Sequence, residues 1–114
     1  MASDCLFCKM AAGAFAVDKL YEDGLLFVIR DIKPRAPIHA LVIPEQHIVS
    51  AHELTLDDGR LLGHMFATAN RIADELEIGE RGYRLTFNVG DEGGQTIYHL
   101  HLHLLGGGRL GPEA

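Results

Sequence analysis

Hydrophobic and polar residues alternate most regularly near the end of the chain, where residues 97–105 read Ile-Tyr-His-Leu-His-Leu-His-Leu-Leu. Successive side chains of a β-strand point to opposite faces of the sheet. A strand over residues 98–105 therefore turns its alternate leucines, Leu100, Leu102 and Leu104, toward the core. The same strand presents a row of imidazoles on its other face: His99, His101 and His103.

Other patterns predict the remaining elements. Strands are expected at residues 20–22, 25–31, 40–43 and 83–89, where apolar and β-branched residues lie between Gly, Pro and Asp. The dipeptide Asp23-Gly24 favours a type I′ hairpin turn between the first two strands. Apolar residues at helical spacing predict a short helix over residues 5–12 and a long one over 55–78, with Thr55 as N-cap and Gly79 closing its C-terminus.

These elements predict an α+β fold with an antiparallel sheet of about five strands, one long helix and a short N-terminal helix. The chain has 114 residues, enough for one core, and we expect a single domain over residues 1–114. The broad apolar face of 55–78 and the apolar strand 83–89 also predict a homodimer. In it, the 83–89 strands of two subunits pair and extend the sheet.

Composition narrows the class of partner. A formal net charge of −6 without a basic stripe argues against binding to nucleic acid. No apolar run reaches the roughly 20 residues that span a bilayer, and the N-terminus lacks a secretory signal pattern. Two cysteines, Cys5 and Cys8, suit a reduced pair or half of a metal site better than a long-loop disulfide. These features predict a cytoplasmic protein.

Four segments resemble the histidine triad family, and together they cover nearly the whole chain. They read Asp-Ile-Lys-Pro-Arg-Ala-Pro at 31–37, Val-Ile-Pro-Glu-Gln-His-Ile at 42–48, Asn-Val-Gly followed by Gly-Gly-Gln-Thr within 88–96, and His-Leu-His-Leu-His-Leu-Leu at 99–105. The resemblance is to the Hint-like branch. Because the related uridylyltransferase branch has Gln in place of the third histidine, the resemblance implies hydrolysis.

The resemblance implies a mechanism for the histidine row, in which His99 is the third catalytic member. His101 attacks the α-phosphorus of a purine nucleoside phosphoramidate or related nucleotide conjugate, and water hydrolyses the nucleotidyl-histidine. Neutral imidazole is a good nucleophile, and this step needs no cofactor. His103 and the Thr96 hydroxyl hold the phosphate oxygens. We expect a backbone carbonyl of the Gly93-Gly94 turn to fix the tautomer of His101.

The resemblance also implies where the nucleoside lies. Asp31 accepts the ribose hydroxyls, while Asn88, Gln95 and Thr96 lie near the scissile phosphate. An apolar slot takes the base and favours broad purine acceptance. Its members are Leu6, Phe7, Met10, Ile29 and Ile32.

Other interpretations of the same residues remain open. The histidine row could be a metal platform, or the pocket could bind a mononucleotide without turnover, as a regulatory module. Asp31 and Thr96 could be turn residues, and the apolar slot could belong to the core. His39, His52 and His64 are interpreted as ordinary surface or capping residues.

The Cys5-Leu6-Phe7-Cys8 segment suggests a metal site in addition to the histidine row. Some members of the family carry a structural zinc site, and the resemblance implies Cys5, Cys8, His47 and His99 as its ligands. The alternative is two reduced thiols that pack beside Phe7.

The C-terminal tail differs from that of animal members of the family, which contains a tryptophan, because this chain has no tryptophan. The resemblance therefore leaves the leaving-group preference open. Arg109 could approach a phosphate.

Overall fold

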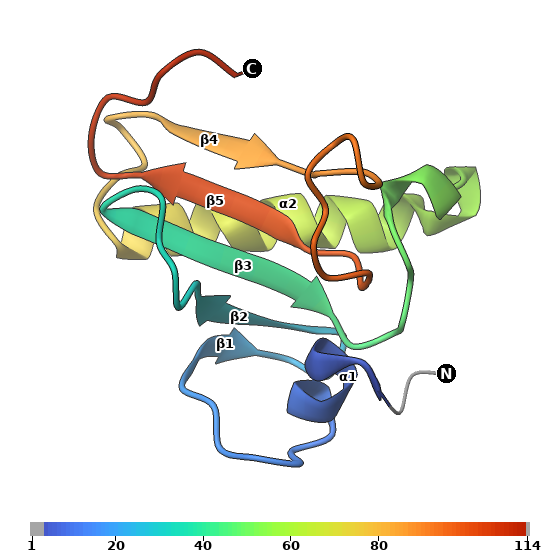
Figure 1. The fold of residues 1–114 in the computed structure, drawn as a ribbon. Helices are drawn as coiled ribbons and strands as arrows, with labels where there is room; N and C mark the ends of the chain where they lie inside the picture. Colours follow the sequence, from blue (N-terminus) through green and yellow to red (C-terminus); the bar gives the residue numbers. More distant parts are fainter. Residues whose placement is uncertain (1–3, 114) are drawn as a thin grey trace.

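The computed structural model describes residues 4–113, and its strands form one antiparallel sheet in the order β1-β2-β3-β5-β4 (Figure 1). The strands are β1 (Lys19–Glu22), β2 (Leu26–Arg30), β3 (Ile38–Pro44), β4 (Tyr83–Thr86) and β5 (Leu102–Gly106). The helices are α1 (Leu6–Ala11) and α2 (Gly59–Glu75), with 3₁₀ turns η2 (Ala51–Glu53) and η3 (Leu56–Asp58). The predicted α+β class, with five strands, one long helix and one short helix, is confirmed.

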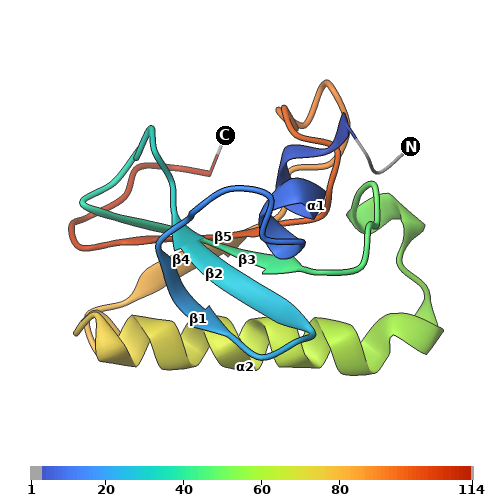
Figure 2. The same cartoon turned by 90° about the horizontal axis from the view of Figure 1, so that it is seen from below.

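The two helices lie on opposite faces of the sheet (Figure 2). The long helix α2 runs beneath it, whereas α1 lies above it, beside the loop that leads into β5. Each face has its own apolar cluster. The sheet is therefore buried on both sides in its middle, and the buried histidines lie on the face that carries α1.

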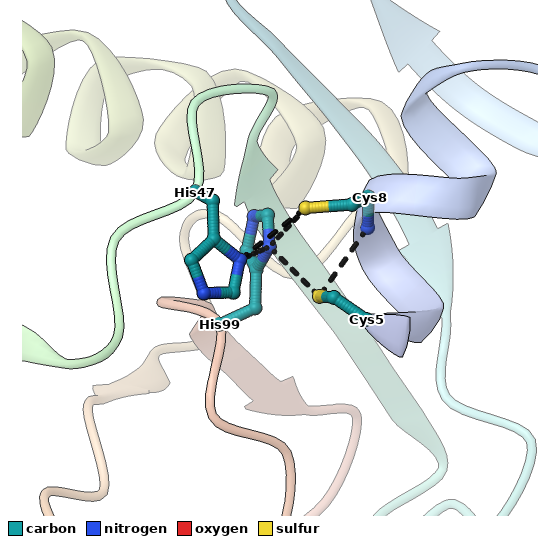
Figure 3. Close-up of side chains that lie close together, drawn as sticks. All are labelled: Cys5, Cys8, His47 and His99. Atoms are coloured by element: carbon teal, nitrogen blue, oxygen red, sulfur yellow. Dashed lines mark hydrogen bonds between the residues drawn. The ribbon is translucent and has the colours of Figure 1, made fainter. Parts of the chain in front are cut away.

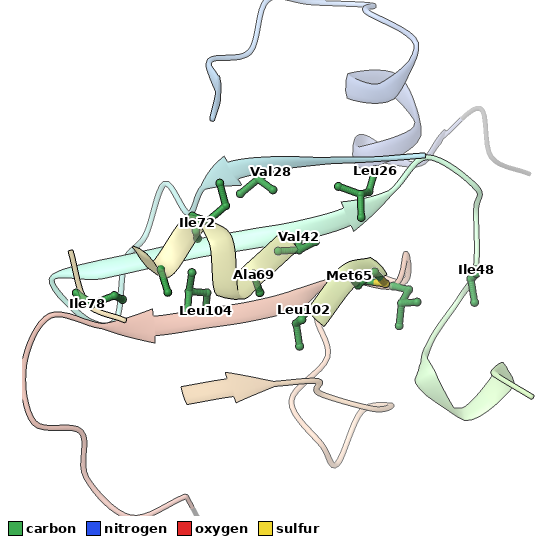
Figure 4. Packing of buried hydrophobic residues seen from close by; sticks show 13 residues of the cluster. Leu26, Val28, Val42, Ile48, Met65, Ala69, Ile72, Ile78, Leu102 and Leu104 are labelled. Atoms are coloured by element: carbon green, nitrogen blue, oxygen red, sulfur yellow. The ribbon is translucent and has the colours of Figure 1, made fainter. Parts of the chain in front are cut away.

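Alternation along the central strands fills the two clusters. On the α2 side, Val42 of β3 and Leu102 and Leu104 of β5 pack against Met65, Ala69 and Ile72 of the helix (Figure 4). On the α1 side, Phe7 packs against Phe27 and Ile29 of β2 and Leu41 and Ile43 of β3. The leucines of the histidine row thus face the core as predicted.

The ends of the long helix differ from the prediction. Thr55 caps η3, with a reciprocal bond to Asp58, and α2 begins only at Gly59. At the other end Glu77 has a φ of 65°, and the N–H groups of Glu77 and Ile78 bond to the carbonyls of Asp74 and Ala73. This is a Schellman arrangement. The prediction that Gly79 closes the helix is therefore wrong, because Glu77 adopts the left-handed conformation.

The boundaries of the strands and the type of one turn also differ from the prediction. The β1–β2 turn is not type I′, because among the described residues Glu77 is the only non-glycine with positive φ, and type I′ requires it at Asp23 as well as Gly24. Instead, the Asp23 carboxylate accepts bonds from the N–H groups of Leu25 and Leu26. Strand β4 ends at Thr86, and β5 starts only at Leu102, so His99 and His101 precede the paired strand.

Two further features bear on partners. Strand β4 forms one edge of the sheet, since it pairs with β5 alone. Within residues 4–113, neither α1 nor α2 has the length and hydropathy needed to cross a bilayer.

Candidate active site

The three histidines of the row lie on the α1 face and are almost wholly buried. The exposed fractions are 0% for His99, 9% for His101 and 5% for His103. The His101 and His103 ring centroids are 4.9 Å apart. Phe7 of α1 meets the His101 ring edge to face at 5.2 Å. The short helix therefore helps to fix the orientation of the central imidazole.

A main-chain carbonyl sets the tautomer of His101. Nδ1 of His101 lies 2.7 Å from the carbonyl oxygen of His99, and a carbonyl can only accept. In the neutral ring Nδ1 therefore carries the proton, and Nε2 keeps a free lone pair. The prediction of an acceptor in the Gly93-Gly94 turn is wrong, because the chain before β5 brings the carbonyl two residues upstream into reach.

A buried relay sets the tautomer of His103. The Arg35 backbone N–H donates to Nδ1 of His39 at 3.1 Å, so neutral His39 carries its proton on Nε2. That Nε2–H lies 2.9 Å from Nδ1 of His103. His103 then accepts at Nδ1 and has Nε2–H as its remaining donor.

His39 thus belongs to the candidate site, and the sequence analysis missed it. It is only 3% exposed, and the prediction of an ordinary surface or capping role is wrong. Its position follows from strand register, since His39 pairs with Leu105 and so lies diagonally from His103 on the same face. By contrast, His52 is exposed, and His64 bonds to Asp23 at the surface.

A cavity of about 500 Å³ opens in front of these rings. We call it the histidine cavity. His101 and His103 form one part of its wall, with Thr96 and Asn88 beside them. Its apolar part is lined by Leu6, Phe7, Met10, Ile29 and Ile32, together with Leu41.

The histidine cavity brings together most of the residues predicted to bind a nucleotide. Asp31 lines it, with Oδ1 accepting from the Lys33 N–H and Oδ2 lying 3.4 Å from Nε2 of His39. Phe7 and Ile29 belong to the buried cluster and still reach the wall. Ile32, in contrast, is 91% exposed at the rim.

Gln95 is placed differently from the prediction. It is buried and does not line the cavity; its amide donates to the carbonyls of Val49 and Ile97 and accepts from the Gly90 N–H. Gln95 therefore holds the loop that carries Thr96. Three basic residues not singled out from the sequence also line the cavity: Arg30, Lys33 and Arg35.

Burial keeps the imidazoles of this site neutral. It lowers the pKa of His103 to about 4, helped by the neighbouring rings of His101 and His39. Burial also lowers the pKa of His101, although the bond to the His99 carbonyl opposes the shift. Burial likewise lowers the pKa of His39, although the negative charge of Asp31 acts to raise it. At neutral pH the relay therefore contains neutral rings with defined tautomers.

A second group of side chains converges beside the row (Figure 3). Four ligand atoms lie within 4.8 Å of one another. They belong to Cys5, the N-cap of α1, to Cys8 within α1, to His47 after β3 and to His99 before β5. Nδ1 of His99 lies 3.2 Å from Sγ of Cys5 and 3.5 Å from Sγ of Cys8. Nδ1 of His47 lies 3.3 Å from Sγ of Cys8 and 3.2 Å from Nδ1 of His99.

These separations fit a tetrahedral metal ion. Zinc bonds of about 2.3 Å to sulfur and 2.0 Å to nitrogen put ligand atoms roughly 3.3–3.8 Å apart. Nε2 of His99 donates to the Pro44 carbonyl at 2.7 Å, which leaves Nδ1 free to bind a cation. The Cys and His cluster can therefore bind a metal.

The metal-binding clusters do not bring all three histidines of the row together. Among residues 4–113, each cluster with metal-binding spacing takes one histidine of the row: His99 with the cysteines and His47, or His103 with Asp31 and His39. His101 belongs to neither cluster.

Comparison with known proteins agrees with this geometry. Residues 15–110 match the HIT domain. The chain belongs to the HIT family. A HIT relative, the purine nucleoside phosphoramidase of Escherichia coli K12, is 41% identical over 112 residues, which are 98% of this chain and 94% of that protein.

Solved structures of HIT proteins have the same fold. A HIT family hydrolase from Clostridium thermocellum superposes with a TM-score of 0.94 at 41% identity, covering 99% of this chain and 98% of the other. A Zn-bound histidine triad family protein from Mycobacterium smegmatis superposes with a TM-score of 0.77 at 28% identity, covering 92% and 76%. The fold and family are those of HIT hydrolases.

Proposed function

We propose that this protein hydrolyses purine nucleoside phosphoramidates or related nucleotide conjugates through a nucleotidyl-histidine intermediate on His101. The observation that carries the proposal is the bond from Nδ1–H of His101 to the His99 carbonyl. It leaves an unprotonated Nε2 on a ring that lines a nucleotide-sized cavity. The 41% identity to a protein named purine nucleoside phosphoramidase supports the substrate class.

The reaction proceeds in two displacements. Nε2 of His101 attacks the α-phosphorus; the P–N bond to the leaving amine breaks, and the amine takes up a proton. Water then attacks the same phosphorus, the bond to Nε2 breaks, and the mononucleotide leaves. A covalent intermediate of this kind replaces one difficult step by two easier ones.

The groups around His101 stabilise charge on the phosphoryl oxygens. Nε2–H of His103 and the Thr96 hydroxyl are donors on the cavity wall beside His101, and His39 keeps His103 in its donor tautomer. Donors fixed in a buried site stabilise developing charge without reorganisation. His99 contributes through its carbonyl, so it acts as a positioning residue for the nucleophile.

The nucleoside occupies the other part of the histidine cavity. Asp31 accepts the ribose hydroxyls, and the base lies between the exposed side chain of Ile32 and the apolar residues of α1. These contacts are apolar and carry few hydrogen bonds, so they accept either purine. Asn88 lies beside the phosphate.

We propose a structural zinc at Cys5, Cys8, His47 and His99. Four protein ligands complete a tetrahedral shell and leave no open position for substrate or water. When bound, the metal would tie α1 to the segment after β3, through His47, and to the segment before β5, through His99. The phosphoryl chemistry takes place on His101, outside this shell, and needs no cofactor.

We also propose one domain over residues 1–114 that forms a homodimer by pairing the β4 edge strands. Such pairing removes an exposed sheet edge.

The free thiols of Cys5 and Cys8 favour a reducing, cytoplasmic location. A small nucleotide, without nucleic acid or membrane, is the proposed partner.

Purified protein incubated with adenosine 5′-phosphoramidate tests the function. We expect release of AMP and ammonia, with a rate that a chelator does not change at temperatures where the protein remains folded. Binding of AMP without turnover would overturn the enzyme proposal in favour of a nucleotide-binding module. Turnover that disappears with the metal while the fold persists would overturn the metal-independent mechanism.

A further inference from the structure

A second cavity adjoins the histidine cavity. It has a volume of about 260 Å³ and shares Arg35, Asn88 and His103 with the histidine cavity. Its remaining wall comes from β4, β5 and the tail, with Arg84, Thr86, Leu105 and Leu110 among the lining residues. The two cavities therefore meet at His103.

The order of residues along β5 shows which end of a bound nucleotide approaches this second cavity. His101 lines only the histidine cavity, His103 lines both, and Leu105 lines only the second. The base and ribose lie at the opposite end, toward Phe7 and Asp31. A group attached to the phosphorus beyond the nucleoside therefore extends past His103 into the second cavity.

The charged residues of this cavity give it a net positive charge. Arg35 and Arg84 contribute two guanidinium groups, and Glu113 contributes one carboxylate. None of the four ion pairs found within residues 4–113 involves these three residues. Guanidinium binds carboxylate strongly because its planar fork can donate two parallel hydrogen bonds.

Arg84 also shapes the outer wall. Its Nη2 donates to the carbonyl oxygen of Gly111, which holds the tail over the α1 face of the sheet. The remaining N–H groups of its guanidinium are available to a ligand. The tail that closes this cavity contributes no tryptophan to its wall, because the chain contains none.

We propose that the second cavity binds the leaving group, and that Arg84 and Arg35 favour an amine carrying a carboxylate, such as an amino acid joined through its α-nitrogen to the phosphorus. This inference rests on the proposed hydrolase activity and names its leaving-group class. The P–N bond is the one that breaks, and the amino acid departs with its carboxylate unchanged. Glu113 opposes this preference, since its charge repels the same carboxylate.

Two substrates that differ only in this charge provide the test: adenosine 5′-phosphoramidates of glycine and of glycinamide. We expect kcat/KM to be about tenfold higher for the glycine conjugate, the effect of one charge-assisted contact. Arg84→Gln should bring the ratio close to one, Arg84→Lys should restore part of it, and Glu113→Gln should increase it. Arg81→Gln, which removes a neighbouring arginine outside both cavities, serves as the charge-matched control and should keep the ratio.

The ratio separates recognition from a structural effect. If Arg84 only holds the tail, Arg84→Gln slows both substrates equally, and the inference is overturned. A wild-type ratio near one, with both substrates hydrolysed, overturns the inference and leaves the hydrolase proposal standing. Hydrolysis of neither substrate, nor of the unsubstituted phosphoramidate, overturns both.

Discussion

The carbonyl oxygen of His99 lies 2.7 Å from Nδ1 of His101, while the side chain of His99 belongs to the Cys and His cluster. One residue thus contributes to two sites, through its ring to the cluster and through its main chain to the proposed nucleophile. The main chain of His99 therefore connects the cluster directly to His101.

Replacing His101 by Ala removes the proposed nucleophile. We expect phosphoramidate hydrolysis to fall by more than about a thousandfold, because the attacking nitrogen is lost, while AMP still binds. Steady-state rates and calorimetric titration with AMP measure the two effects. A covalent nucleotidyl adduct detected by mass spectrometry in wild type should be missing in the variant. Activity within about tenfold of wild type would contradict the assignment.

His39→Phe removes the donor to His103 and allows the other tautomer of that ring. We expect kcat to fall by roughly 10–100-fold, the range for losing a residue that orients a histidine of the site, with little change in the Kd for AMP. Nitrogen-15 NMR of the ring should report a shift of the His103 proton from Nε2 toward Nδ1. The exposed His52, changed to Phe, is the control. An unchanged His103 tautomer would show that His39 has a packing role only.

Cys5→Ser removes one ligand of the cluster. We expect a fall in Tm of roughly 10 °C, corresponding to about 2 kcal/mol for a domain of this size, because the metal no longer ties α1 to the sheet. A chelator should lower the Tm of wild type to the same value and leave the variant unaffected. Elemental analysis of protein purified without chelator should find one zinc per chain; its absence would leave Cys5 and Cys8 as packing residues.

The acid stability of the protein depends on Asp23. Burial alone would raise its pKa, but hydrogen bonds from the Leu25 N–H, the Tyr21 hydroxyl, His64 and the Leu26 N–H lower it from 3.8 to about 2. The folded state therefore binds this proton less readily than the unfolded chain. The stabilisation is fully present above about pH 4 and is lost as the pH falls toward 2.

Urea unfolding between pH 2 and 6 measures this contribution. We expect wild type to lose about 1 kcal/mol more than Asp23→Asn over the acid range, because solvent screening reduces the effect of this exposed group. Asp57→Asn, at another exposed carboxylate, is the control. Equal pH dependence in wild type and Asp23→Asn would contradict the prediction.

The β4 edge predicts a homodimer. Light scattering at micromolar concentration should give twice the mass of one chain, because pairing of two β4 strands satisfies their free backbone groups and continues the sheet. A mass of one chain, unchanged up to millimolar concentration, would show that the edge stays unpaired.

The sequence by itself determined which residues face the core and which are available for chemistry. Alternation over residues 99–105 is a local property of extended backbone, so it correctly turned Leu102 and Leu104 toward α2 and the histidines toward the other face. The spacing of Cys5 and Cys8 and the helical spacing of apolar residues in α2 are likewise local properties of the sequence.

Only the tertiary structure decided which partners those residues find. The acceptor for His101 depends on the path of the chain before β5, and the role of His39 depends on the β3–β5 register, which joins residues 64 positions apart. Gln95 fixes the loop before Thr96 because its side-chain amide donates to the carbonyl of Val49, which is distant in the sequence. Sequence periodicity specifies the direction of a side chain, whereas hydrogen-bond partners depend on long-range packing, which no local pattern encodes.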